Sequence, residues 1–289
     1  MKNCVALLLV ALMLFECTRS TEIKTKEVAK ESFQSGFVPI GPLKFYYEIH
    51  GQGGVPLILI HGGGSTIQTT FGSTLELFAN DRQVIAVEIQ AHGHTPDAGR
   101  PLTFEQDADD VAALLDFLKI PKADILGFSN GGSTALQMAI RHPGKVNKIV
   151  PISAIYKRDG MFTGFFDGMK GATIESMPQP LKDGYLEVEN NTQQGLQRMF
   201  ERDRDRMIAF QDWPDESIQS IKIPALIVVG DHDVVTVEHA TRMAKLITHS
   251  SLLVLPGNHG SFIGEICSIQ PGSKMPELTV GMIKDFLDE

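Results

Sequence analysis

The chain has 289 residues, of which 43% are hydrophobic and 21% are charged. These values are ordinary for a soluble globular protein and exclude an intrinsically disordered chain, and the length is sufficient for one large domain. The formal net charge is −9 and no Lys/Arg run occurs, which argues against nucleic acid as a partner.

The first twenty residues, MKNCVALLLVALMLFECTRS, have the layout of a secretory signal peptide. Lys2 precedes an apolar run from Val5 to Phe15, and small or polar residues follow it. The run is too short to cross a bilayer as a helix. We therefore expect residues 1–20 to be a signal peptide, residues 21–289 to hold the folded domain, and the protein to be exported to the periplasm or the medium.

The cysteines allow one alternative to free export. Cleavage near Ser20 would leave only Cys267, so no intramolecular disulfide is expected. Cys17 closely follows the apolar run, and a lipid anchor at this residue is the alternative. Glu16 disfavours it, because the bacterial lipobox has a small residue before its cysteine. The sequence thus predicts no stable membrane span.

The first half of the domain alternates between strand and helix patterns. The segment SGFVPIGPLKFYYEIHG (35–51) predicts two strands around a Gly-Pro turn. Continuous apolar runs at 55–62 and 83–89 predict strands that are buried on both faces. Apolar positions at helical spacing predict a helix over 103–118, with Thr103 and Gln106 as its capping box.

The same alternation continues to the end of the chain, with one interruption. The remaining patterns predict strands at 123–128, 146–153, 223–230 and 251–255, and helices at about 131–141, 237–247 and 279–288. Such alternation implies right-handed crossovers and a mostly parallel sheet with helices on both faces, which is an α/β fold. Residues 155–220 lack an apolar strand pattern and are too many for a plain loop. We expect them to form a helical cap insertion over one end of the sheet.

Residues with catalytic potential follow the predicted strands, where open α/β sheets bind their ligands. Ser129 lies between Gly127 and Gly131 in the spacing G-x-S-x-G, which suits a strained strand-to-helix turn. Asp231 and Asp233 follow the strand at 223–230, and His259 follows the strand at 251–255. The order Ser, Asp, His is the one associated with the nucleophile elbow.

Six segments together resemble the α/β-hydrolase superfamily, in its branch of small esterase-like and C–C-bond hydrolases. They are HGGG at 61, VIAVEIQAHGHT at 84, GFSNGG at 127, RHPGKV at 141, IPALIVVGDHD at 223 and LPGNHG at 255. The resemblance covers residues 45–289 and implies that fold. It also implies Asp233, rather than Asp231, as the acid of the triad. One departure is Glu88-Ile89-Gln90-Ala91-His92-Gly93, where the family commonly has D-x-R-G-H-G.

The expected chemistry is acyl transfer. Ser129 is the predicted nucleophile, His259 its base and Asp233 the residue that orients the imidazole; imidazole titrates at about pH 6.5 in model compounds. The backbone N–H groups of Gly63 and Asn130 are the predicted oxyanion hole. Residues expected to line a substrate pocket are Gly64, Met161, Phe162, Phe165 and Phe166.

Several alternatives remain at this stage. The predicted function is hydrolysis of a small carboxylic ester without cofactor or metal, and hydrolysis of a C–C bond or a lactone uses the same triad. A binding protein on the hydrolase scaffold has no need for all three triad residues. A metal site formed by His92, His94, Asp231 and His232 is disfavoured, because no metalloprotease motif or dense His/Cys spacing accompanies them.

Overall fold

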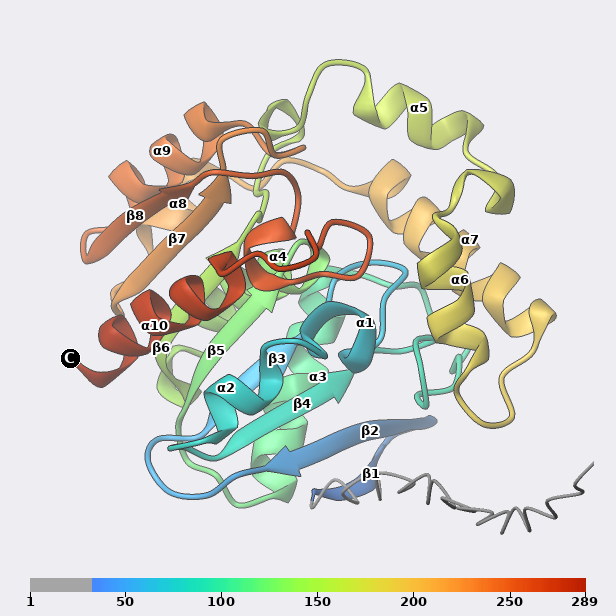
Figure 1. The fold of residues 1–289 in the computed structure, drawn as a ribbon, viewed down its shortest axis with the longest axis horizontal. Helices are drawn as coiled ribbons and strands as arrows, with labels where there is room; N and C mark the ends of the chain where they lie inside the picture. The colour runs from blue at the N-terminus through green and yellow to red at the C-terminus, as the bar shows by residue number, and fades with distance from the viewer. Residues whose placement is uncertain (1–32) are drawn as a thin grey trace, which may run out of the picture. The chain divides into compact units, whose positions relative to one another are not determined.

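A computed structural model describes residues 33–289, so the predicted signal peptide and Cys17 lie outside the described residues. Within residues 33–289, eight strands form one sheet in the order β1-β2-β4-β3-β5-β6-β7-β8 (Figure 1). The strands are β1 (Gln34–Ile40), β2 (Leu43–His50), β3 (Leu57–Ile60), β4 (Val84–Glu88), β5 (Ala123–Phe128), β6 (Val146–Ile152), β7 (Ala225–Gly230) and β8 (Ser250–Leu255). β1 and β2 are antiparallel to their neighbours, and the pairs from β4 to β8 are parallel. The predicted α/β fold is confirmed.

Helices cover both faces of the sheet, because the central strands are apolar on both sides. In β3, Ile58 and Ile60 belong to one buried cluster, and Leu57 and Leu59 belong to another, as period-two alternation requires. The first face carries α3 (Phe104–Phe117), α4 (Asn130–Arg141), α8 (Asp215–Gln219) and α9 (Val237–Leu246). The second carries α1 (Ile67–Phe71), α2 (Leu75–Ala79) and α10 (Met275–Asp288).

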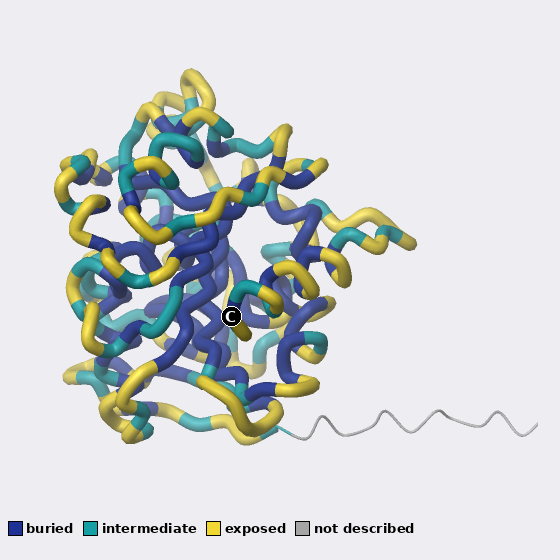
Figure 2. Tube along the Cα trace, turned by 90° about the vertical axis from the view of Figure 1, so that its left-hand side faces the viewer, coloured by how far each residue is buried: buried dark blue, intermediate teal, exposed yellow. Residues whose placement is uncertain are grey.

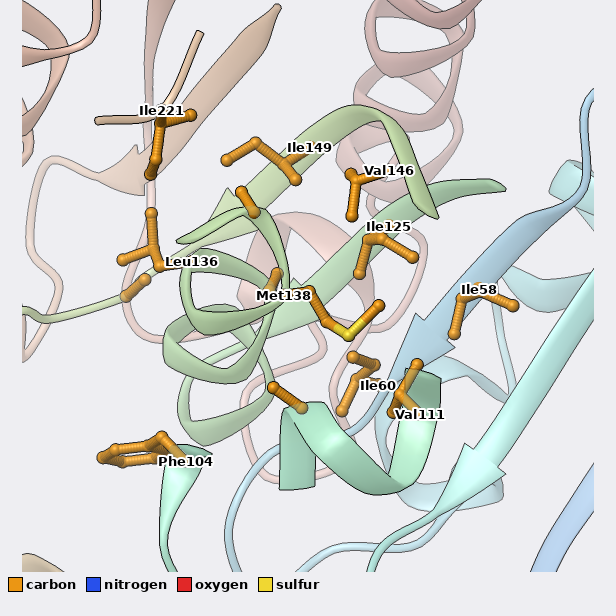
Figure 3. Close-up of a cluster of buried hydrophobic side chains, with 14 of the residues drawn as sticks. Ile58, Ile60, Phe104, Val111, Ile125, Leu136, Met138, Val146, Ile149 and Ile221 are labelled. Atoms are coloured by element: carbon orange, nitrogen blue, oxygen red, sulfur yellow. The ribbon is translucent and has the colours of Figure 1, made fainter. Parts of the chain in front are cut away.

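The core lies between the sheet and these helices. Figure 2 shows a buried interior with exposed segments around it, and the edge strands β1 and β8 are partly exposed. On the first face, Ile58, Ile125 and Ile149 of the sheet belong to one buried cluster with Val111 of α3 and Met138 of α4 (Figure 3). Burial of such aliphatic side chains stabilises the fold by about 1.5 to 3 kcal/mol each. The packed sheet therefore fixes the positions of the loops at its carboxyl edge.

Residues 155–220 contain helices and no strand of the sheet. They form α5 (Phe165–Gly171), α6 (Gln179–Leu186), α7 (Gln193–Ala209) and α8, with short 3₁₀ turns at Arg158–Gly160 and Ile174–Ser176. In Figure 1, α5, α6 and α7 lie on the side to which the arrowheads of β4 and β5 point. A small cluster of their own, Met177, Tyr185, Leu196 and Met199, is buried among them. We refer to α5, α6 and α7 as the cap helices.

Two local expectations need correction. The helices α1 and α2 were not predicted, because each has five residues and is too short to show a helical period. The predicted capping box of α3 is only half formed. Thr103 accepts the Gln106 N–H at 3.0 Å, but the Gln106 side chain donates to Asp110 at 3.1 Å and does not accept the Thr103 N–H.

Within residues 33–289, no helix combines the length and the apolar composition that a bilayer crossing requires.

Candidate active site

Ser129 lies at a sharp turn between β5 and α4. Its backbone has φ 55° and ψ −117°, a region that non-glycine residues rarely adopt. Such strain persists only where the surrounding structure fixes it, and it is typical of functional sites. The turn directs the hydroxyl away from the end of the strand and into a cavity that Ser129 lines.

The flanking glycines are needed because the backbone crosses itself at this turn. A Cβ on Gly127 would overlap the carbonyl oxygen of Gly131, and a Cβ on Gly131 would overlap the carbonyl oxygen of Ile60. Neither obstacle is a flexible side chain that could move aside. The G-x-S-x-G spacing therefore has the steric cause that the sequence suggested.

The structure brings Ser129, His259 and Asp233 together from three loops. His259, in the loop after β8, has its Nε2 atom 3.1 Å from the Ser129 Oγ atom. Its Nδ1 atom is 2.7 Å from Oδ1 of Asp233, in the loop after β7. A carboxylate only accepts, so Nδ1 carries the proton and Nε2 is free to accept the serine hydroxyl. This is the proton arrangement that a serine nucleophile requires.

The Asp233 carboxylate is completely buried and held on both oxygens. Oδ1 also accepts the Val235 N–H at 3.2 Å, and Oδ2 accepts the Ser153 hydroxyl at 2.6 Å and the Gly230 N–H at 3.3 Å. Burial by itself would raise the pKa of Asp233, but the bonds from His259 and Ser153 outweigh it and hold this pKa below its usual range. The carboxylate thus stays ionised beside the imidazole.

Two backbone N–H groups beside Ser129 have no protein acceptor within residues 33–289. They belong to Gly63, after β3, and to Asn130, the first residue of α4. Both residues line the cavity with Ser129. A Cβ at Gly63 would overlap the Asn130 side-chain amide nitrogen, so a side chain there would require this amide to shift. These are the two groups that the sequence predicted as oxyanion donors.

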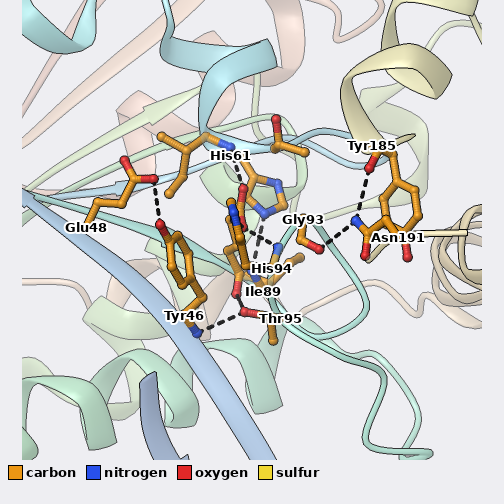
Figure 4. A network of polar contacts seen from close by, with 12 residues as sticks. Tyr46, Glu48, His61, Ile89, Gly93, His94, Thr95, Tyr185 and Asn191 are labelled. Carbon is orange, nitrogen blue, oxygen red and sulfur yellow. Dashed lines mark hydrogen bonds and ion pairs between the residues drawn. The ribbon is translucent and has the colours of Figure 1, made fainter. Parts of the chain in front are cut away.

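Hydrogen bonds connect the loop after β3, which carries Gly63, to the loop after β4 (Figure 4). His61 Nδ1 lies 2.7 Å from the Gly62 carbonyl oxygen, and the Ile89 N–H donates to Nε2 at 3.2 Å. Burial and the neighbouring His92 lower the pKa of His61 to about 3, so the ring is neutral. On the other side, Asn191 donates to the Gly93 carbonyl oxygen at 2.8 Å, which connects the segment after α6 to the loop after β4.

The cavity above Ser129 has a volume of about 360 Å³ and is mostly apolar. Its walls come from the cap helices and from the loops after β3, β6 and β7. Besides Ser129, Asn130, Gly63 and His259, its lining includes Gly64, Ile155, Met161, Phe165, Met169, Met177, Leu181, Phe200, Asp203, Met207, Val234 and Val235. Three of the predicted pocket residues, Gly64, Met161 and Phe165, are among them.

Phe162 and Phe166 do not line this cavity, which corrects the sequence-based prediction. Phe162 is 50% exposed. Phe166 stacks on Phe210 with ring centroids 6.4 Å apart. The Cζ atom of the Arg158 guanidinium lies 3.7 Å from the centroid of the Phe166 ring. In a short helix, adjacent aromatic residues point in different directions, so only Phe165 of this group faces Ser129.

Sequence reasoning missed two polar residues of the site. Ser153 follows β6 at φ 51° and carries no motif. Asp203 lies within the charged run ERDRDR of α7. Its spacing of four residues from Met199 and from Met207 places it on the apolar face of that helix. A charged residue on an apolar face is the sequence feature that could have identified it.

The other polar residues considered from the sequence have structural contacts. Asp231 accepts the Gly257 N–H at 2.8 Å, which ties the two loops that carry Asp233 and His259. His94 Nδ1 lies 2.8 Å from Glu88 Oε2. Within the described part of the chain, no three His, Cys, Asp or Glu side chains are grouped so that they could hold a metal ion.

Comparison with known proteins agrees with this geometry. The profile described as alpha/beta hydrolase fold matches residues 55–179. The human serine hydrolase BPHL is 30% identical over 243 residues, which cover 79% of this chain and 81% of that protein. The 2-hydroxy-6-oxo-2,4-heptadienoate hydrolase of Pseudomonas putida is 26% identical, over 71% of this chain and 83% of that protein.

Solved structures show the same fold. The crystal structure of the enol-lactonase from Burkholderia xenovorans has a TM-score of 0.68 and 20% sequence identity, and the match covers 88% of this chain and all of that one. The matched sequence, the sheet order and the strained serine turn lead to one assignment. The chain belongs to the α/β-hydrolase family of enzymes.

Proposed function

We propose that this protein is a serine hydrolase that cleaves a small carboxylic ester through an acyl-enzyme intermediate. The observation that carries this proposal is the continuous contact from Asp233 to His259 to Ser129, at 2.7 Å and 3.1 Å, at the wall of a mostly apolar cavity. A serine hydroxyl is a weak nucleophile unless a base removes its proton, and His259 is oriented to do so.

In the first half of the reaction, the Ser129 Oγ atom attacks the ester carbonyl carbon as its proton passes to His259 Nε2. The carbonyl oxygen becomes an oxyanion and accepts hydrogen bonds from the Gly63 and Asn130 N–H groups. The imidazolium is stabilised by Asp233. Collapse of the intermediate breaks the bond to the leaving alcohol, which takes the proton from Nε2, and leaves the acyl group on Ser129.

In the second half, a water molecule gives a proton to His259 Nε2 and attacks the acyl carbon. The same N–H groups hold the second oxyanion. Its collapse returns the proton to the Ser129 oxygen and releases the carboxylic acid, so the enzyme regains its starting state. Every proton is accounted for by Ser129, His259, water and the two products.

The cavity favours an uncharged substrate of modest size. Apolar side chains such as Met161, Phe165 and Met207 form most of its lining, and Asp203 and Arg204 are the charged side chains that lie on it within the described residues. Its volume of about 360 Å³ lies near the lower end of small-molecule sites. We infer a neutral ester with a short or medium apolar chain.

The test is a comparison of wild-type protein and Ser129→Ala on a series of p-nitrophenyl esters. We expect the wild type to turn over esters and the variant to lose about 10³-fold or more in kcat while keeping its thermal unfolding temperature. Full esterase activity in the variant would overturn the proposal. Ser133→Ala is a suitable control, because this serine lines the same cavity but donates to the Ile155 carbonyl oxygen.

A C–C-bond or lactone substrate is the second candidate. The same three residues support these reactions, and two of the similar proteins are named as a 2-hydroxy-6-oxo-2,4-heptadienoate hydrolase and an enol-lactonase. A panel of esters, lactones and vinylogous diketones separates the three, with kcat/KM as the readout. A non-catalytic ligand-binding protein would turn over none of them and would not react with a fluorophosphonate.

We also propose that the protein is exported. The support is the sequence of residues 1–20 alone, with its Lys2 and its apolar run up to Phe15. Expression of the full chain in bacteria, followed by fractionation and N-terminal sequencing, tests this. A mature form that begins near residue 21, in a soluble periplasmic or medium fraction, is expected; an intact N-terminus in the cytoplasm or fatty-acid labelling at Cys17 contradicts it.

A further inference from the structure

One buried carboxylate beside Ser129 has no part in the mechanism above. Asp203, on the cap helix α7, is 8% exposed and lines the same cavity as Ser129. Its Oδ2 atom accepts the Gly64 N–H at 2.6 Å and lies 2.7 Å from His92 Nε2. Its Oδ1 atom lies 3.5 Å from the Asn130 side-chain amide. One carboxylate of the cap thus contacts both segments that carry the proposed oxyanion donors.

Its contact with His92 fixes the position of one proton. His92 is completely buried, and its Nδ1 atom lies 2.9 Å from the Gln90 carbonyl oxygen, so Nδ1 must carry a hydrogen. The 2.7 Å contact between Nε2 and Oδ2 then needs a proton of its own. The Gly64 N–H also lies 3.3 Å from Nε2, but its shorter bond is to the carboxylate, which favours an ionised Asp203 and an imidazolium.

The charges around this pair support the same assignment. Burial by itself would lower the pKa of His92, but the Asp203 carboxylate outweighs it and raises this pKa above its usual value. Burial would likewise raise the pKa of Asp203, and His92, the Arg206 guanidinium and the Gly64 N–H hold it well below its usual range. Arg206, one turn further along α7, also pairs with Asp107 of α3 at 2.9 Å. The carboxylate is therefore neutralised locally, so that it can lie near a developing oxyanion.

The turn that receives this carboxylate is built from residues with great backbone freedom. Gly62, Gly63 and Gly64 are consecutive, and glycine has the greatest backbone freedom of any residue. Gly64 is in the left-handed region at φ 67°. Because Asp203 takes the Gly64 N–H, it fixes the peptide next to Gly63 and leaves the Gly63 N–H directed to the cavity.

We infer that Asp203 is a positioning residue of the oxyanion hole, which the cap helix α7 completes from above by holding the Gly63-Gly64 turn against Asn130. This inference rests on the proposed function. Asp203 acts through the Gly63 N–H and does not touch the reacting atoms. Its effect should therefore appear where an oxyanion forms and not in the binding of the uncharged ester.

The test compares Asp203→Ala and Asp203→Asn with the wild type. The measurements are kcat and KM for the best p-nitrophenyl ester, and Ki for an alkyl trifluoromethyl ketone, which adds to the serine and forms an oxyanion. Asp205→Ala is the matched control, because it removes an exposed acid from the same helix. Wild-type turnover and its loss in Ser129→Ala are established first, so failure of the proposed function is seen separately.

We expect Asp203→Ala to lower kcat by about 10- to 100-fold, short of the roughly 10²- to 10³-fold loss for removal of a donor itself. KM should change by less than about threefold, and Ki should rise in parallel with the fall in kcat/KM. Asp203→Asn should be intermediate, because its amide oxygen can still accept the Gly64 N–H. Asp205→Ala should match the wild type.

Three results would overturn the inference: wild-type kcat and Ki in Asp203→Ala, a rise in KM with kcat unchanged, or an Asn variant no better than the Ala variant. The last result would show that the effect comes from the charge of Asp203 and not from the position of the Gly63-Gly64 turn. If Asp203→Ala fails to fold, the isosteric Asp203→Asn carries the test, with a lowered kcat and a parallel rise in Ki as the expected outcome and wild-type values as the contrary one.

Discussion

Replacement of Asp233 by Asn gives a quantitative test of how the imidazole is held. In the wild type, each carboxylate oxygen accepts two hydrogen bonds: Oδ1 from His259 and Val235, and Oδ2 from Ser153 and Gly230. An asparagine must place an NH₂ group at one of these positions. At the Oδ1 position it would face two N–H donors, whereas at the Oδ2 position the Ser153 hydroxyl can rotate and accept from it.

The second arrangement is therefore favoured, and it leaves His259 in its productive tautomer. The loss is then confined to the charge that stabilises the imidazolium in the transition state. A hydrogen bond to a charged group contributes about 1.5 to 3 kcal/mol, which corresponds to about 10- to 160-fold in kcat. If the His259 ring were held in the wrong tautomer, kcat would fall by about 10⁴-fold.

The assay is kcat for the best p-nitrophenyl ester at pH 8, measured for Asp233→Asn and for the double variant Asp233→Asn, Ser153→Ala. We expect a loss of about 10- to 160-fold in the single variant and a larger loss in the double variant, which lacks the hydroxyl that accepts from the amide. A loss near 10⁴-fold in the single variant, or equal losses in both, would refute this reasoning about the amide orientation.

Three further predictions follow from individual contacts. Ser153→Ala should lower kcat by about 3- to 15-fold in a steady-state assay, because Asp233 loses one charge-assisted hydrogen bond of its four; an unchanged kcat would show that the remaining bonds suffice. Gly127→Ala should lower the thermal unfolding temperature by several degrees or prevent folding, since its Cβ meets backbone, whereas Gly168→Ala, with no atom within 4 Å of its Cβ, should leave that temperature within about 2 °C. Acid should destabilise the fold through His61, whose pKa of about 3 lies below the unfolded value of about 6.5, so its contribution is complete above pH 6.5 and is lost as pH falls. From pH 7 to pH 5 this amounts to about 2 kcal/mol in urea unfolding, and a His61→Asn variant with the same slope as the wild type would contradict it.

The sheet and the three side chains of the proposed triad were predictable from sequence for a physical reason. Strands buried on both faces are continuous apolar runs, and the residue that follows such a run lies at the carboxyl edge, where ligands bind. Ser129 and Asp233 each follow such a run, and His259 follows the apolar edge strand β8, so the order of the strands indicated that the three side chains would converge. The glycines at 127 and 131 marked the backbone crossing independently.

The cap was less predictable, because its residues contact the site through packing and not through a local pattern. Three phenylalanines occupy neighbouring positions in the sequence: Phe162, Phe165 and Phe166. Of these, only Phe165 lines the cavity. Asp203 is one of several charges in a row, and its carboxylate contacts His92, which lies 111 residues earlier in the chain. Contacts such as the one between Asp203 and His92 depend on how α7 packs against the loops of the sheet. Sequence spacing alone does not predict this packing.

The proposed mechanism requires Ser129 to be the nucleophile. The most direct measurement is the mass of the intact protein and of its tryptic peptides after reaction with diethyl p-nitrophenyl phosphate. We expect one diethylphosphoryl group on the peptide that contains Ser129, formed in step with the loss of esterase activity. The label should be absent from Ser129→Ala, and its formation should be strongly slowed in His259→Ala. Inactivation with the label on another residue, or esterase activity that persists after complete labelling of Ser129, would contradict it.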